Sequence, residues 1–178
     1  MSWFQENYSA AFSNPILQSV LIIWGSVIAA KITDVIFTRI FKRVVDKTET
    51  SLDDQILQLL HRPIFYTILF IGFSVAVKTA GLPEYIDFAL VGIFKTITIL
   101  IWLVIAMKML VVSMDWASRK TTSPLLQQKT LPLFNNLGKI GIGLFGIYFI
   151  FLSWDINING ILASAGVLGV VLGLAAKD

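Results

Sequence analysis

Hydrophobic residues occur along this chain in long, nearly continuous blocks that are separated by short polar stretches. The blocks begin near residues 15, 63, 88, 133 and 160. Each approaches or exceeds the ~20 residues that a helix needs to cross the hydrocarbon core of a bilayer. Charged residues are concentrated between the blocks rather than within them. The pattern predicts an all-α integral membrane protein with five transmembrane helices, over about 15–30, 63–79, 88–112, 133–154 and 160–176.

The first block continues into an amphipathic helix with a basic end. Its cationic residues are Lys31, Arg39, Lys42, Arg43 and Lys47. Because this segment is longer than the bilayer requires, we expect its basic end to project past the headgroups and contact anionic lipid. A short polar helix is expected over 52–62, and Pro63 suits the first turn of the helix that follows it.

Composition places the chain in a membrane. Of its 178 residues, 56% are hydrophobic and 14% are charged, with a mean hydropathy of +0.79. Soluble domains carry about 25% charged residues, so a water-soluble enzyme or a free nucleic-acid-binding protein is disfavoured. There is no cysteine and only one histidine, His61, which we expect near the membrane interface without a ligand role. The sequence predicts no catalytic residue, no metal site and no cofactor.

The distribution of charge predicts the topology. Residues 1–14 contain four aromatic side chains but no Lys or Arg, which favours an interfacial anchor over a cleavable signal peptide. A loose terminal tail is the alternative. Basic residues concentrate between the first and second blocks and between the third and fourth, whereas Glu84, Asp87 and Asp155 lie in the opposite loops. The positive-inside rule then puts the N-terminus outside and the C-terminus in the cytoplasm of an inner (plasma) membrane.

The fifth block differs from the others because it is built from small residues. It contains Gly160, Gly166, Gly169 and Gly173, several alanines and no aromatic residue. Small residues allow helix backbones to approach closely inside a membrane. A helix that is small on every side is therefore unlike one that faces lipid.

A helical wheel divides this segment into three stripes. With 100° per residue, Gly169 and Gly173 lie within about 60° of Gly166, while Val170 and Leu174 lie on an adjacent aliphatic face. Ser164 and Ala175 lie roughly opposite the glycines. A ring of identical helices would pair the glycine stripe with the far stripe and leave Val170 and Leu174, about 6 Å apart along the axis, for a lumen. Such aliphatic rings form constrictions that gate by dewetting. A helix buried in a monomeric bundle, with no lumen, is the alternative.

The residues from Thr130 to Asp178 resemble the small-conductance mechanosensitive channel (MscS-like) family. The Gly-x-x-x-Gly-Leu-Ala pattern from Gly169 to Ala175 belongs to the pore helix of that family. Another stretch is similar to members with extra outer helices; it comprises Asp53, Asp54, Leu59, Leu60, Arg62 and Pro63.

The resemblance implies a homoheptameric channel that membrane tension opens, passing ions and small solutes to protect against hypo-osmotic shock. It implies that Val170 and Leu174 form the pore constriction. The residues that would pack pore helices together are Ala163, Ala165, Gly166, Gly169, Gly173, Ala175 and Ala176. Lys177 and Asp178 would lie at the inner pore mouth. In the family this helix continues into a cytoplasmic β-domain and cage, so we expect the chain to be part of a longer polypeptide.

Several lysines lie within apolar blocks. Lys95 is expected toward the outer side of the membrane, and Lys108 and Lys139 toward the inner side. Snorkelling to the headgroups, or contact with lipid phosphates, is favoured over pairing with Asp115 or Asp34. For Asp34 the simplest partner is Lys31, three residues earlier on the same helix.

These expectations divide the chain into four parts: an anchor over 1–14, a tension sensor of three outer helices over 15–129, a fourth helix and tight turn over 130–159, and the start of the pore-lining helix over 160–178. Lipids, further copies of the chain and permeating solutes are the expected partners, and nucleic acid is not. A small secondary transporter and a non-conducting membrane scaffold are the alternatives. The transporter is disfavoured because no span has a central acidic residue.

Overall fold

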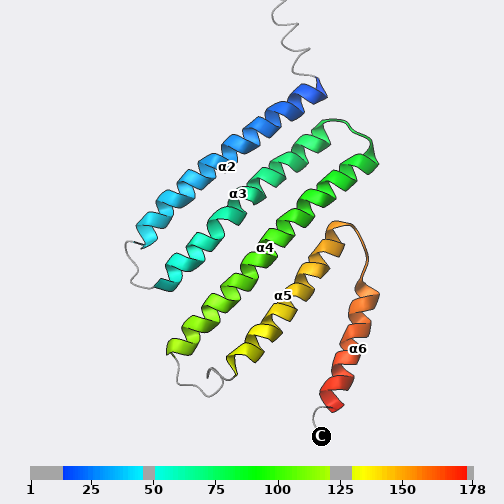
Figure 1. Cartoon of the computed structure of the whole chain (residues 1–178). Coiled ribbons are helices and arrows are strands. Elements are labelled where there is room, and N and C mark those ends of the chain that lie inside the picture. The colour runs from blue at the N-terminus through cyan, green and yellow to red at the C-terminus, as the bar shows by residue number, and fades with distance from the viewer. Residues whose placement is uncertain (1–13, 46–50, 121–129, 176–178) are drawn as a thin grey trace, which may run out of the picture.

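The described part of the chain forms five helices (Figure 1). The structure is a computed structural model that describes residues 14–45, 51–120 and 130–175. The helices are α2 (Pro15–Val45), α3 (Ser51–Thr79), α4 (Glu84–Lys120), α5 (Leu131–Ser153) and α6 (Asn159–Ala175). Within those ranges no strand occurs. The all-helical class and the five helices predicted from the apolar blocks are confirmed.

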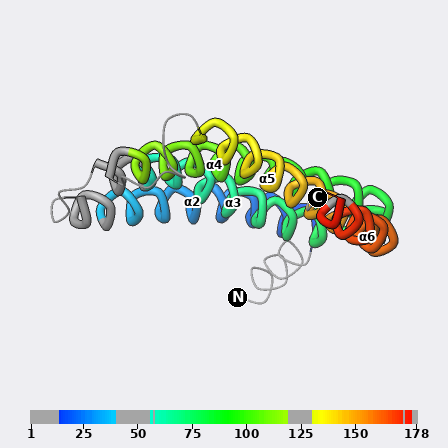
Figure 2. Tube along the Cα trace, turned by 90° about the horizontal axis from the view of Figure 1, so that it is seen from below, coloured from blue at the N-terminus to red at the C-terminus, as the bar shows by residue number. Residues whose placement is uncertain are grey.

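Helices α2 to α5 lie side by side in an antiparallel row, each packed on its neighbours in sequence (Figure 1). Seen at a right angle to that view, the row is one shallow, curved layer (Figure 2). A layer one helix thick encloses little core. The buried apolar side chains of the described residues are those of Ala30, Ala76, Val91 and Ile105, together with Pro63. Large apolar side chains are exposed along every helix, as expected for a protein that meets lipid or other chains rather than water.

Four of the helices are long and apolar enough to cross a membrane, judged by length and composition: residues 15–39, 58–79, 84–118 and 131–153. The 17 residues of α6 are apolar but shorter. At 1.5 Å per residue, α6 is about 25 Å long, close to the ~30 Å thickness of the hydrocarbon core.

Close approach between neighbouring helices depends on glycine. A Cβ at Gly72 of α3 would collide with the Ser26 side chain of α2, and one at Gly146 of α5 would collide with Leu103 of α4. The absence of a side chain at these two positions lets the helices approach closely, which supplies the dispersion contacts that hold membrane helices together.

Two hydrogen bonds from tryptophan indoles also link neighbouring helices within the layer. Trp102 of α4 donates from Nε1 to Thr67 Oγ1 of α3 at 2.9 Å, and Trp154 donates from Nε1 to Thr96 Oγ1 of α4 at 2.9 Å. Each threonine hydroxyl donates its own proton to a carbonyl four residues earlier, Pro63 O and Gly92 O respectively. The hydroxyl is thereby oriented to accept from the indole, so both donors are satisfied without water.

Helix α3 corrects one expectation. A separate short helix over 52–62, with Pro63 in the first turn of the next, was predicted, but α3 runs unbroken from Ser51 to Thr79 with Pro63 inside it. Proline removes one backbone hydrogen bond from a helix. Pro63 is fully buried, and α3 packs along α2; this packing keeps the two halves of α3 continuous, a common solution in membrane helices.

Candidate functional site

The last helix begins after a tight turn at the end of α5. Asp155 adopts a positive φ of 53°, and the Asn157 side chain accepts a hydrogen bond from the Asn159 backbone N–H at 3.0 Å. This cap satisfies one of the free N–H groups at the start of α6. The turn directs α6 away from the row, and α6 is not packed along any other helix of the described chain (Figure 1).

Every side chain described in α6 is exposed. Val170 and Leu174 are 63% and 65% exposed. At Gly160, Gly166, Gly169 and Gly173 no neighbouring atom lies within 4 Å of where a Cβ would be. The structure therefore does not show the alternative, in which α6 would be buried in a bundle formed by a single chain.

The stripes predicted for this segment require one regular helix, and α6 is uninterrupted from Asn159 to Ala175. The helical period then puts Gly166, Gly169 and Gly173 on one face, with Val170 and Leu174 beside it. The hydroxyl of Ser164 donates to Gly160 O at 2.8 Å, so its polar hydrogen is satisfied within the helix. Ala163 and Ala165 are exposed on the same helix. Ala176, Lys177 and Asp178 lie outside the described residues.

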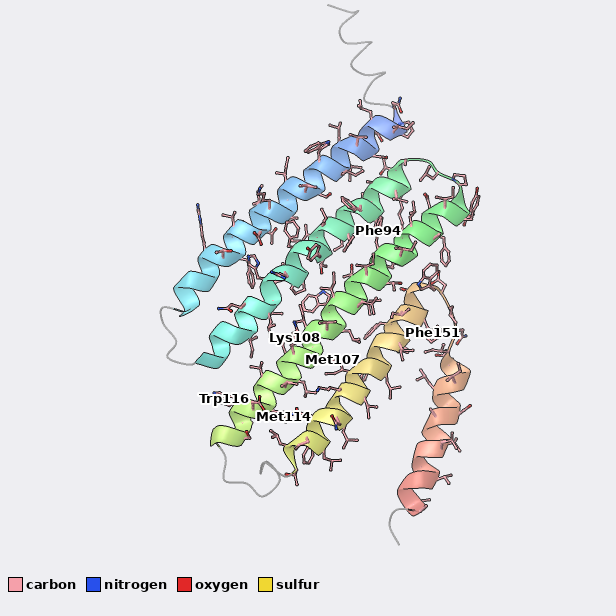
Figure 3. The ribbon with its side chains drawn as sticks, viewed as in Figure 1. Phe94, Met107, Lys108, Met114, Trp116 and Phe151 are labelled. Atoms are coloured by element: carbon pink, nitrogen blue, oxygen red, sulfur yellow. The ribbon has the colours of Figure 1, made fainter. Side chains whose placement is uncertain are left out.

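The basic residues assigned to lipid contact lie at the surface where their side chains are described. Arg39, Lys108 and Lys139 are exposed, and Figure 3 labels Lys108 on α4. Lys42 and Arg43 belong to α2, but the structure does not describe their side chains, and Lys47 lies outside the described residues. Lys95, Lys108 and Lys139 form no ion pair within the described part of the chain, so pairing of these lysines with Asp115 or Asp34 is not observed there.

A polar cluster between α2 and α3 was missed from the sequence. His61 Nε2 lies 2.8 Å from Asp34 Oδ1 and 3.1 Å from Thr38 Oγ1. The expectation that Asp34 pairs with Lys31 is therefore wrong, since its partner is His61 on the neighbouring helix. Asp34 and Thr38, four residues apart, share one face of α2, and that face meets α3. The i, i+4 spacing was visible in the sequence, but the register between the helices was not.

The described residues hold no group of three His, Cys, Asp or Glu side chains placed to bind a metal ion. The polar groups that the fold brings together instead join helices in pairs. These are the His61 cluster and the two indole–threonine bonds. Helix α6, which is exposed and not packed along another described helix, is therefore the candidate site for contact with other chains.

Comparison with known proteins identifies the class of this chain. A family model described as "Mechanosensitive ion channel, transmembrane helices 2/3" matches residues 136–177, which are most of α5 and α6. The small-conductance mechanosensitive channel MscMJ of Methanocaldococcus jannaschii is 31% identical over 81 residues, covering 46% of this chain and 23% of that protein. An uncharacterized MscS family protein of Aquifex aeolicus is 25% identical over 180 residues, covering 92% of this chain and 44% of that protein. No solved structure matches significantly.

The chain is thus similar, over its C-terminal part, to the MscS-like family of mechanosensitive channels. It spans less than half the length of either curated relative. The match to the family model falls on the part of the chain with the exposed, glycine-rich helix.

Proposed function

We propose that this chain is the membrane part of a mechanosensitive channel subunit and that α6 lines the pore. The observation that carries the proposal is the exposure of α6. A helix rich in Gly, Ala, Val and Leu that is not packed along another helix of the described residues lies where the channel family model matches. Small-residue helices in membranes are stabilised by close packing against other helices, and other copies of α6 supply that packing.

In the proposed assembly, copies of α6 surround a central axis. The stripe of Gly166, Gly169 and Gly173 receives the Ser164 and Ala175 stripe of the next copy. The alanines at 163, 165 and 176 complete the contact. A homoheptamer is the stoichiometry that the family resemblance implies.

The aliphatic face of α6 then faces the lumen. Val170 and Leu174 are one turn apart, about 6 Å along the axis, so seven copies give two stacked apolar rings. A narrow apolar constriction excludes water, and ions that need their hydration shell are excluded with it. Lys177 and Asp178 follow at the inner mouth, where their charges bias which ions enter.

Tension acts on the layer formed by α2 to α5. Tension favours the state of larger in-plane area, and it shifts the equilibrium only by the difference between the two states. The layer is one helix thick (Figure 2) and exposes large apolar side chains along its helices, so lipid contacts it directly and transmits the load to α6 through the α5–α6 turn. Opening releases ions and small solutes and protects the cell during hypo-osmotic shock.

The proposed topology has the N-terminus outside and the C-terminus in the cytoplasm of the inner (plasma) membrane. It rests on the basic residues between α2 and α3 and between α4 and α5, against acidic residues at the other end of the layer. Arg39, Lys42, Arg43, Lys47, Lys108 and Lys139 would then contact lipid phosphates on the cytoplasmic side.

The direct test is patch-clamp recording under a suction ramp, with the full-length protein in liposomes of purified phospholipid. We expect stepwise currents that appear above a threshold tension and are absent from protein-free liposomes. Silence up to lytic tension, with intact oligomers present in the same membranes, would contradict the proposal. That result would favour a non-conducting scaffold or a secondary transporter.

A further inference from the structure

One face of the helix layer carries an open groove between α3, α4 and α5. The groove has a volume of about 580 Å³ and is lined by residues of all three helices. Aromatic side chains form much of its wall: Phe70 of α3 stacks on Phe94 of α4 with ring centroids 5.7 Å apart, and Phe149 of α5 lines the other side. Phe94 is labelled on α4 in Figure 3.

The groove continues toward the middle of α4. A second hollow of about 400 Å³ between α4 and α5 shares Thr98, Ile99 and Phe149 with the first and extends to Ala106. No charged residue lines this second part. From Lys95 to Ala106 the axial rise is about 16 Å, close to the ~15 Å that one leaflet contributes to the hydrocarbon core.

The groove also carries positive charge. Lys78, in the last turn of α3, and Lys95 both line it, and both side chains are exposed. Within the described residues neither lysine forms an ion pair, and no Asp or Glu lines the groove. Two unpaired ammonium groups in the lining of a largely apolar groove favour a ligand with an anionic head and an apolar tail.

We propose that the groove binds one anionic phospholipid. Its phosphate lies between Lys78 and Lys95, and one acyl chain follows α4 past Thr98 to Ala106. With the topology proposed above, this lipid belongs to the outer leaflet. The inference does not depend on channel activity, because it rests on the groove and its lysines alone.

A second copy of the chain fits the groove less well. The helix left free for other copies, α6, has no charged residue between Asn159 and Ala175. It would fill the apolar part and leave both ammonium groups unpaired.

The position of the lipid is tested by photocrosslinking. Full-length protein is placed in nanodiscs of phosphatidylglycerol that contain a fraction with a diazirine on one acyl chain, and labelled peptides are mapped by mass spectrometry. We expect the strongest labelling in 67–78, 91–106 and 142–153. Thr98→Trp fills the junction of the two hollows and should lower this labelling severalfold. Val104→Trp is the matched control, since Val104 is half-exposed on the same helix and lines neither hollow.

The role of the lysines is tested by native mass spectrometry of the detergent-solubilised protein titrated with phosphatidylglycerol. At about 1 kcal/mol for each basic residue near a lipid headgroup, the double variant Lys78→Gln/Lys95→Gln should bind about 30-fold more weakly. Lys78→Arg/Lys95→Arg keeps both positive charges and should bind as the wild type does. Phosphatidylcholine has no net charge, so its affinity should fall less in the double variant than the affinity of phosphatidylglycerol does.

Two results would overturn the proposal. One is equal phosphatidylglycerol affinity for the wild type and the double lysine variant. The other is protein–protein crosslinking through the groove from a photoreactive residue at position 98, which would mean that a second copy occupies it.

Discussion

The imidazole of His61 on α3 lies 2.8 Å from the carboxylate of Asp34 on α2, across the interface of the first two helices. The two side chains are 37% and 31% exposed, so both are only partly buried in the interface between the helices. Thr38 Oγ1 lies 3.1 Å from the same imidazole nitrogen and donates to Asp34 O. The cluster therefore fixes the register between α2 and α3 with a bond that is specific to one alignment of the helices.

His61→Ala should destabilise the fold by roughly 1–3 kcal/mol, because Asp34 then loses its partner. Thermal unfolding of the purified protein in detergent measures the effect. Lys31→Ala removes the helix neighbour first expected to pair with Asp34, and it should leave the melting temperature unchanged. Equal losses in the two variants would argue against the interhelical pair.

Gly72→Ala should cost roughly 1–3 kcal/mol in stability. The added Cβ would meet the rigid Cβ of Ser26 rather than the end of a flexible side chain, so α2 and α3 must separate to admit it. Gly25→Ala, one residue from Ser26, enters open space and should be neutral or stabilising by up to ~1 kcal/mol. If both variants melt alike, the close contact between α2 and α3 is not formed.

Trp154→Phe should weaken the link between α4 and the end of α5 by roughly 0.5–1.5 kcal/mol, because the indole bond to Thr96 is lost while the ring is largely kept. Thr96→Val removes the acceptor instead. A double-mutant cycle on unfolding free energies should give a coupling of comparable size, since the two changes remove one interaction. Strict additivity would mean that the two side chains do not interact.

If α6 lines the pore as proposed, Leu174→Ser and Val170→Ser should each lower the tension at which the channel opens. A hydroxyl in place of an aliphatic side chain makes the constriction easier to hydrate. The free energy of hydration should change by on the order of 1 kcal/mol per subunit, and each copy in the proposed ring contributes the same amount. Patch-clamp thresholds measure it. Leu168→Ser, on the opposite face of α6, is the control and should shift the threshold less. Unchanged thresholds in both lumen variants would remove these residues from the pore.

Gly173→Leu should prevent assembly of the proposed ring, because a branched side chain would occupy the glycine stripe that is proposed to receive the neighbouring α6. In the described part of the chain no atom lies within 4 Å of a Cβ built at Gly173, so the fold of the single subunit should survive. Size-exclusion chromatography with light scattering separates the two effects. Gly25→Leu, also in open space but far from α6, should assemble normally. An intact oligomer in Gly173→Leu would contradict the packing proposed for α6.

The helices were predictable because apolar blocks of membrane-spanning length leave few alternatives for the backbone. The stripes of α6 followed from residue size and the helical period. The pairing of Asp34 with His61 was not predictable, because it depends on how far α3 slides along α2, which local spacing does not determine. The continuity of α3 through Pro63 was missed for the same reason: the packing that keeps the helix straight comes from another helix.

The row of helices described above has a consequence for biogenesis. Among the described residues, the main contacts of α2 to α5 are with the helix that precedes or follows in the chain. Each of these interfaces therefore closes a short loop, and the contact order is low. Each hairpin can form as soon as its second helix has left the ribosome and entered the bilayer, without waiting for distant sequence. Helix α6 is then presented unpaired beside an already folded layer, and in the proposed ring its association with other copies is a separate step that depends on subunit concentration.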